Sequence, residues 1–217
     1  PKYTKNEEAI LNLIRDLYLV GVSTRKMEIA LRNILGRYGI SAGSVSNITG
    51  KIIPEIEAFH KRPIEDIYVY LYLDGITITV NGNDDKGKKY ILLVAYGVNK
   101  YGVKEIIDFV MVRSESYDNW NGFLFNLYER GLKGANLKLI IIDGCKGLSQ
   151  ALDGLWQRTL RQRCWMHKLG NVCKYLKKSD EDACINQARG IYSAISLRQA
   201  LKRFNAWKDS WYKLYPK

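Results

Sequence analysis

Two kinds of hydrophobic pattern divide this chain. Up to about residue 60, apolar residues recur at spacings of three and four, which is typical of amphipathic helices. From residue 64 to about 163, continuous apolar runs and strict alternation predominate, as in β-strands. Helical spacing returns beyond Arg163. We therefore expect a helical N-terminal region, an α/β core and a helical C-terminal segment.

The N-terminal region predicts three helices, broken at Gly21 and between Gly36 and Ile40. A helix, a short turn and a helix with small polar outward side chains are typical of a helix-turn-helix, which we place at residues 23–53. Any small three-helix bundle would show the same pattern, so a purely structural bundle remains the alternative. Residues 1–63 are assigned to this DNA-binding region and a linker ending at Pro63. The side chains predicted to contact DNA are Ser44, Ser46, Asn47 and Lys51.

The core predicts an RNase H-like mixed sheet with flanking helices. Three antiparallel-looking strands, a helix, a strand, a helix and a short strand follow one another, and in that fold the first and fourth strands are neighbours. Residues 64–176 are assigned to this core, in partial form, and residues 177–217 to a helical insertion segment. The first strand is expected at 68–73, with 76–80 as its half-exposed partner, and the other two meander strands at 90–97 and 103–112. The fourth strand is expected at 137–142, the short last strand at 159–163, and the helices at 116–130 and 147–156.

Two of these apolar strands are followed directly by Asp-Gly, at Asp74-Gly75 and at Asp143-Gly144. Asp-Gly is a common turn pair, so each occurrence alone has a simple structural explanation. Its repetition after buried strands favours a second interpretation, in which Asp74 and Asp143 meet at one edge of the sheet. Carboxylate oxygens are the ligands that Mg²⁺ prefers. We therefore predict a divalent metal site held by both aspartates, with Mg²⁺ or Mn²⁺ as the ion.

The net charge of +12 is unevenly distributed along the chain. Residues 1–63 carry a charge of +4, residues 64–157 carry −2, and residues 158–217 carry +10. Basic segments on both sides of an acidic centre fit a protein that holds a polyanion, although a charge excess also simply serves solubility. We expect double-stranded DNA as the partner. The basic residues expected to line its path include Arg158, Arg161, Arg163 and Lys168.

The remaining composition narrows the class of protein. No apolar run approaches the length of a membrane span, and no signal peptide opens the chain. We therefore expect a soluble, cytoplasmic protein without a membrane partner. The four cysteines have no secretory context and are expected to be reduced thiols.

Several blocks resemble the Mutator-type transposases of prokaryotic insertion sequences, in the order of that family and over nearly the whole chain. The blocks are 70–75, 92–98, Ser114-Glu115-Ser116 with Trp120, 142–148 and 161–172. The resemblance implies an RNase H-like domain with an Asp-Asp-Glu triad, and an N-terminal DNA-binding region. It also implies transposon ends and target DNA as substrates, a homo-oligomer in the active form, and Asp74 and Asp143 as the first two acids.

The third acid of the triad has no clear counterpart. In the family it follows the helical insertion, and this chain stops at Lys217 within insertion-like helices. Glu181 has a spacing that suits compact relatives, but it lies in an acidic helix start. We expect the glutamate to be absent, so that this chain alone binds DNA without cleaving it. The alternatives are a non-catalytic remnant or regulator of transposition, and an unrelated nuclease that uses Glu181.

Cys164 and His167 form the Cys-x-x-His signature that the family carries near its active site. At positions i and i+3 of one helix, the two side chains face the same way. Structural zinc sites need four ligands, and only one pair is present here. We expect the pair to support the active site by packing and hydrogen bonding that hold the strand of the second aspartate, Asp143. Polar contacts to DNA and metal ligation are the alternatives.

Overall fold

The computed structural model describes residues 43, 50, 52–80 and 87–216. The chain divides into two compact units, residues 1–63 and residues 64–217. In the first unit, helix α4 spans Ile52–Lys61 and ends before Pro63, whose ring is incompatible with a helix interior. Part of the predicted linker is therefore helical. The predicted helix-turn-helix lies almost entirely outside the described residues, as do Ser44, Ser46, Asn47 and Lys51.

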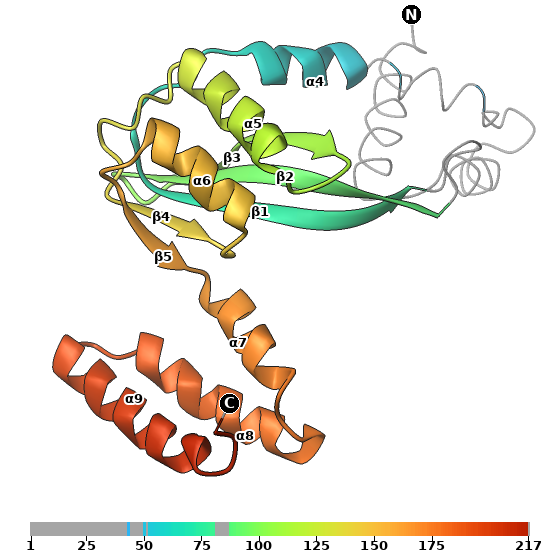
Figure 1. Ribbon diagram of the computed structural model, residues 1–217. Helices are drawn as coiled ribbons and strands as arrows, with labels where there is room; N and C mark the ends of the chain where they lie inside the picture. The colour runs from blue at the N-terminus through green and yellow to red at the C-terminus, as the bar shows by residue number, and fades with distance from the viewer. Residues whose placement is uncertain (1–42, 44–49, 51, 81–86, 217) are drawn as a thin grey trace, which may run out of the picture. The chain divides into compact units, whose positions relative to one another are not determined.

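The second unit is built on a five-stranded mixed sheet with the order β3-β2-β1-β4-β5 (Figure 1). Strand β1 pairs antiparallel with β2, and β2 with β3, whereas β4 lies parallel to both β1 and β5. The expected pairing of the first and fourth core strands is confirmed. The strands span Tyr68–Val80 (β1), Lys88–Asn99 (β2), Lys104–Val112 (β3), Leu139–Ile142 (β4) and Leu160–Arg163 (β5).

The structure corrects one prediction about strand β1. Residues 68–73 and 76–80 were expected to be separate strands joined by the Asp74-Gly75 turn, but they form one continuous strand. Asp74 and Gly75 stay in the ladder, opposite Val94 and Leu93 of the long strand β2. A partner that pairs with both halves keeps the backbone extended, which overrides the turn preference of Asp-Gly. Asp74 therefore lies inside a strand and not at its end.

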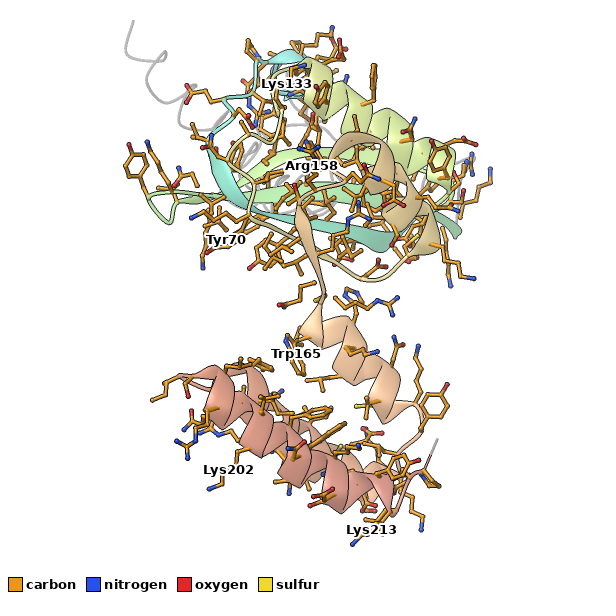
Figure 2. The ribbon with its side chains drawn as sticks, turned by 60° about the vertical axis from the view of Figure 1, so that its left-hand side comes forward. Tyr70, Lys133, Arg158, Trp165, Lys202 and Lys213 are labelled. Carbon is orange, nitrogen blue, oxygen red and sulfur yellow. The ribbon has the colours of Figure 1, made fainter. Side chains whose placement is uncertain are left out.

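Helices α5 (Tyr117–Glu129) and α6 (Lys146–Leu155) pack together and cover one face of the sheet (Figure 1). Because side chains alternate along β1, Leu71 and Leu73 point into this core and are fully buried. Tyr70 and Tyr72 point to the opposite face, where they are 41% and 43% exposed. Figure 2 labels Tyr70. Asp74 shares their alternation and so projects from the face that α5 and α6 leave uncovered.

The C-terminal segment of the second unit is helical, as predicted. A short turn after β5 leads into α7 (Trp165–Cys173), followed by α8 (Lys178–Tyr192) and α9 (Leu197–Tyr212). Figure 2 labels Trp165 at the start of α7. Leu169, Ala188 and Ile191 form a small core between these helices, and a cavity of about 340 Å³ lies beside it. In the described part of the chain, no helix has the length and apolarity needed to cross a bilayer.

Candidate acidic site on neighbouring parallel strands

The register of β1 and β4 brings the two predicted aspartates together. Leu73 lies opposite Ile142 in the last residue pair of this parallel ladder. Asp74 is the next residue of β1 and Asp143 is the first residue after β4, so the two follow one another across the end of this ladder. The sequence prediction that they lie together rested on the repeated apolar run followed by Asp-Gly.

Each aspartate uses one carboxylate oxygen locally. Oδ1 of Asp74 accepts a hydrogen bond from the Gly75 amide at 3.0 Å, and Oδ1 of Asp143 accepts one from the Cys145 amide at 2.7 Å. These bonds orient both carboxylates. Among the described residues, no hydrogen bond reaches Oδ2 of either aspartate. Mg²⁺ typically takes one or two protein carboxylates together with water and substrate phosphates, so this pair of oxygen donors fits that ion.

A third carboxylate, from Glu115, lies close enough to the two aspartates to feel their charge. The sequence placed Glu115 in a family-like block but assigned it no role. Strand β3 runs in the same direction as β1 and β4, because β2 is antiparallel to both β3 and β1. The loop after β3 therefore emerges at the same end of the sheet as Asp143. The signal that could have identified Glu115 is topological, namely its place directly after the third strand of a meander.

The pKa of Glu115 reports this crowding. Burial raises the pKa of its carboxyl group, and the negative charges of Asp143 and Asp74 raise it further. A hydrogen bond from Cys145 and the nearby His167 act in the opposite direction with smaller effect. The three carboxylates are therefore close enough to repel one another.

Cys164 and His167 both lie next to the aspartates. The backbone amide of Cys164 donates to the carbonyl of Ile142 at 2.7 Å, which ties the start of α7 to the end of β4. Nε2 of His167 lies 3.7 Å from Oδ1 of Asp74, and both side chains are about half exposed. The imidazole thus contacts the first aspartate, whereas the sequence had suggested support for the strand of the second.

Two of the arginines expected to line the DNA path make internal contacts. Arg163 donates from Nη2 to the carbonyl of Gly144 at 2.8 Å. A Cβ at Gly144, whose φ is +99°, would come within 1.8 Å of the same guanidinium, so the turn after Asp143 depends on glycine. Arg161 is anchored on α6, where Nη1 bonds the Ser149 carbonyl at 3.2 Å and Asp153 at 2.7 Å.

The other two predicted DNA contacts are exposed but lie in different places. Arg158 precedes β5, so it sits at the opposite end of the parallel strands from Asp143 (Figure 2). Lys168 follows His167 on α7, is exposed and lines the cavity beside α8 and α9.

Glu181 is not brought to the aspartates. It lies in the first turn of α8, where it accepts a hydrogen bond from Lys178 at 2.8 Å. Among the described residues, no three His, Cys, Asp or Glu side chains stand close enough to hold one metal ion together. The described part of the chain therefore offers a two-carboxylate site, with Glu115 beside it.

Comparison with known proteins places the chain in a family. The family model described as "Transposase, Mutator family" matches residues 1–217. The chain belongs to the Mutator family of transposases. It is 28% identical to the transposase for insertion sequence element IS1201 of Lactobacillus helveticus, over 99% of this chain and 57% of that protein. It is 30% identical to the transposase for ISRM5 of Rhizobium meliloti, over 100% of this chain and 53% of that protein.

The chain thus spans about half the length of the curated transposases it matches. Among solved structures, it is similar to a simian T-cell lymphotropic virus intasome in complex with a PP2A regulatory subunit, with a TM-score of 0.33 and 12% identity. That match covers 88% of this chain and 63% of the other, and it is too distant to inform the fold or the site.

Proposed function

We propose that this chain is the part of an insertion-sequence transposase that binds transposon ends and carries two ligands of its metal-dependent site. The observation that supports this proposal best is the parallel register that sets Asp74 beside Asp143. Both residues lie in blocks that resemble the Mutator family, and family membership covers the whole chain. The complete reaction would be cleavage of DNA at the transposon ends and strand transfer into a target.

The proposed fold of residues 64–176 is RNase H-like. The support is the strand order, with a three-stranded meander and a parallel fourth strand beside the first. In this arrangement Asp74 lies on β1 and Asp143 directly follows β4, so the two carboxylates together would hold a divalent ion. Magnesium in such a site stabilises negative charge on the attacking and leaving oxygens of a phosphoryl transfer.

The protein groups around the aspartates have distinct proposed roles. The amides of Gly75 and Cys145 orient the carboxylates, and His167 positions Asp74 from α7. DNA would approach along the basic stretch from residue 158 onward, with the N-terminal region as a second contact. A homo-oligomer in the active form, and a cytoplasmic location, remain proposals that follow from the family.

A non-catalytic DNA-binding regulator of transposition is the second candidate. The observation that favours it is the lack of a three-ligand cluster among the described residues, with Glu181 paired to Lys178. If the chain is such a regulator, and if the third glutamate is missing as the sequence predicts, the chain alone would bind DNA without cleaving it.

Metal binding tests the proposed two-carboxylate site. We would titrate Mn²⁺ into the 217-residue chain by calorimetry and compare it with the Asp74→Asn and Asp143→Asn variants. Each substitution removes one anionic ligand and is expected to weaken Mn²⁺ binding at least about tenfold, because metal ligation depends on the charged oxygens. The matched control is Asp153→Asn, since Asp153 lies on the exposed side of α6 and pairs with Arg161. Unchanged Mn²⁺ affinity in both site variants would overturn the proposed metal site.

A further inference from the structure

The carboxylate of Glu115 lies against strand β1 in a gap that only glycine leaves open, within electrostatic range of Asp74 and Asp143. A Cβ at Gly75 would lie 1.5 Å from Oε1 of Glu115 and 2.6 Å from its carboxyl carbon. The carboxylate therefore rests directly against the backbone of β1, one residue beyond Asp74. Any other residue at position 75 would displace it.

The loop that carries Glu115 is held in place by the element that follows Asp143. The Cys145 thiol donates to the backbone carbonyl of Glu115 at 3.5 Å. Gly147 of α6 packs so closely on this loop that a Cβ there would lie 2.7 Å from the Tyr117 amide nitrogen. One residue after Glu115, Ser116 caps α5 by accepting from the Asn119 amide at 3.2 Å. Glu115 and Asp143 are thus positioned by the same contacts between α5 and α6.

This arrangement gathers like charges. Within the described ranges, no lysine or arginine forms an ion pair with Asp74, Asp143 or Glu115, and the basic group nearest to Asp74 is the imidazole of His167 at 3.7 Å. Three carboxylates brought together without a fixed cation destabilise the fold by mutual repulsion. A bound divalent cation would relieve that repulsion.

We propose that Glu115 is a positioning residue of the acidic site, which holds the water shell of the divalent cation bound by Asp74 and Asp143. This inference rests on the proposed function. Contact through water agrees with the absence, among the residues described, of three side chains near enough to ligate one ion directly. It also agrees with the chemistry of Mg²⁺, which gives up its water reluctantly and usually keeps several waters in protein sites.

Two variants remove this contact in different ways. Glu115→Gln keeps the size of the side chain and removes its charge. Gly75→Ala keeps the charge but displaces the carboxylate, whose flexible end can move aside. Asp118→Asn is the matched control, because Asp118 is an exposed acid three residues further on in the first turn of α5.

The experiment is calorimetric titration of Mn²⁺ into the full chain and these variants. We expect Glu115→Gln to weaken Mn²⁺ binding by about 10- to 100-fold, as is usual for groups that support metal ligands, and Gly75→Ala to weaken it in the same direction. Asp118→Asn should bind Mn²⁺ like the parent chain. If Glu115→Gln and Gly75→Ala also bind like the parent while Asp74→Asn and Asp143→Asn bind weakly, the role of Glu115 is wrong and the proposed function stands.

Thermal unfolding in a chelator supplies a second readout. Glu115→Gln should raise the melting temperature of the metal-free chain, because it removes repulsion, and Mn²⁺ should then stabilise the variant less than the parent. A carboxylate that served only the fold would instead lower the melting temperature when replaced. That result, or weakening by Asp118→Asn equal to that by Glu115→Gln, would overturn the inference.

Discussion

The acidic side chains of this core differ in whether a basic side chain pairs with them. Asp108 on β3 is 2% exposed and forms an ion pair with Arg130, so its charge is balanced inside the fold. Asp74, Asp143 and Glu115 form no ion pair with any lysine or arginine of the described chain. A buried pair of opposite charges serves the structure, whereas like charges gathered at one place need a ligand to be tolerated. This contrast separates the structural acid from the candidate functional ones.

The first prediction concerns Asp108. Asp108→Ala removes the carboxylate that pairs with the guanidinium of Arg130, and removing one member of a buried pair typically costs about 3–5 kcal/mol. Asp153→Ala is the control, because Asp153 is 63% exposed in its pair with Arg161 and such pairs contribute about 1 kcal/mol or less. Urea unfolding measures both losses. Equal losses would show that Asp108 is not a structural ion-pair residue.

At the scale of elements, the packing of side chains against strand β2 requires glycine at position 97. A Cβ at Gly97 would lie 2.3 Å from the Tyr68 ring and 2.7 Å from Cδ1 of Ile107. Both neighbours are buried, at 4% and 0% exposure, and cannot move aside freely. By contrast, nothing lies within 4 Å of a Cβ added at Gly122 in α5.

These two glycines give a prediction of opposite sign. Gly97→Ala should destabilise the chain by about 1–3 kcal/mol, the usual range for an overpacked core. Gly122→Ala should stabilise it by about 0.5–1 kcal/mol, because alanine is favoured over glycine inside a helix. Unfolding in urea tests both variants side by side. A loss of stability in Gly122→Ala, or none in Gly97→Ala, would contradict the packing described for these elements.

At the scale of the whole molecule, positive charge is concentrated in the last part of the chain, where residues 158–217 carry +10. In the structure, some of these basic side chains bond to other groups of the protein and others are exposed. Arg161 and Arg163 bond to groups of α6 and of the turn after Asp143. Lys168 is exposed one residue after the histidine that contacts Asp74, whereas Arg158 lies at the far end of the parallel strands.

This distribution predicts a difference in DNA affinity. Lys168→Ala should weaken binding to a short mixed-sequence duplex and lower the slope of log K against log salt by about 1, because one phosphate contact is lost. Arg158→Ala, the matched control, should change both quantities less. Fluorescence anisotropy over a range of salt concentrations measures the two effects. A larger effect of Arg158→Ala would place the DNA on the opposite end of the strands.

The sequence by itself determined most of the secondary structure and the position of the two aspartates directly after two apolar runs. Apolar residues recur at every second position in strands and at every third or fourth position in helices, because one side of each element is buried. These patterns can be recognised from the order of residues alone. The repeated apolar run followed by Asp-Gly, with the expected pairing of the first and fourth core strands, then predicted that Asp74 and Asp143 meet. The same local reasoning was wrong at Asp74-Gly75, where pairing with β2 keeps a turn-prone dipeptide extended.

Only the tertiary structure decided which other groups join the aspartates. Glu115 is distant from both in sequence and reaches them because β3 runs parallel to β1 and because Gly75 has no side chain. His167 meets Asp74, and Arg163 covers Gly144, through the turn from β5 into α7. Such contacts depend on strand order and on close approach between distant backbones. Neither leaves a periodic signal in the sequence, so the composition of the acidic site had to come from the fold.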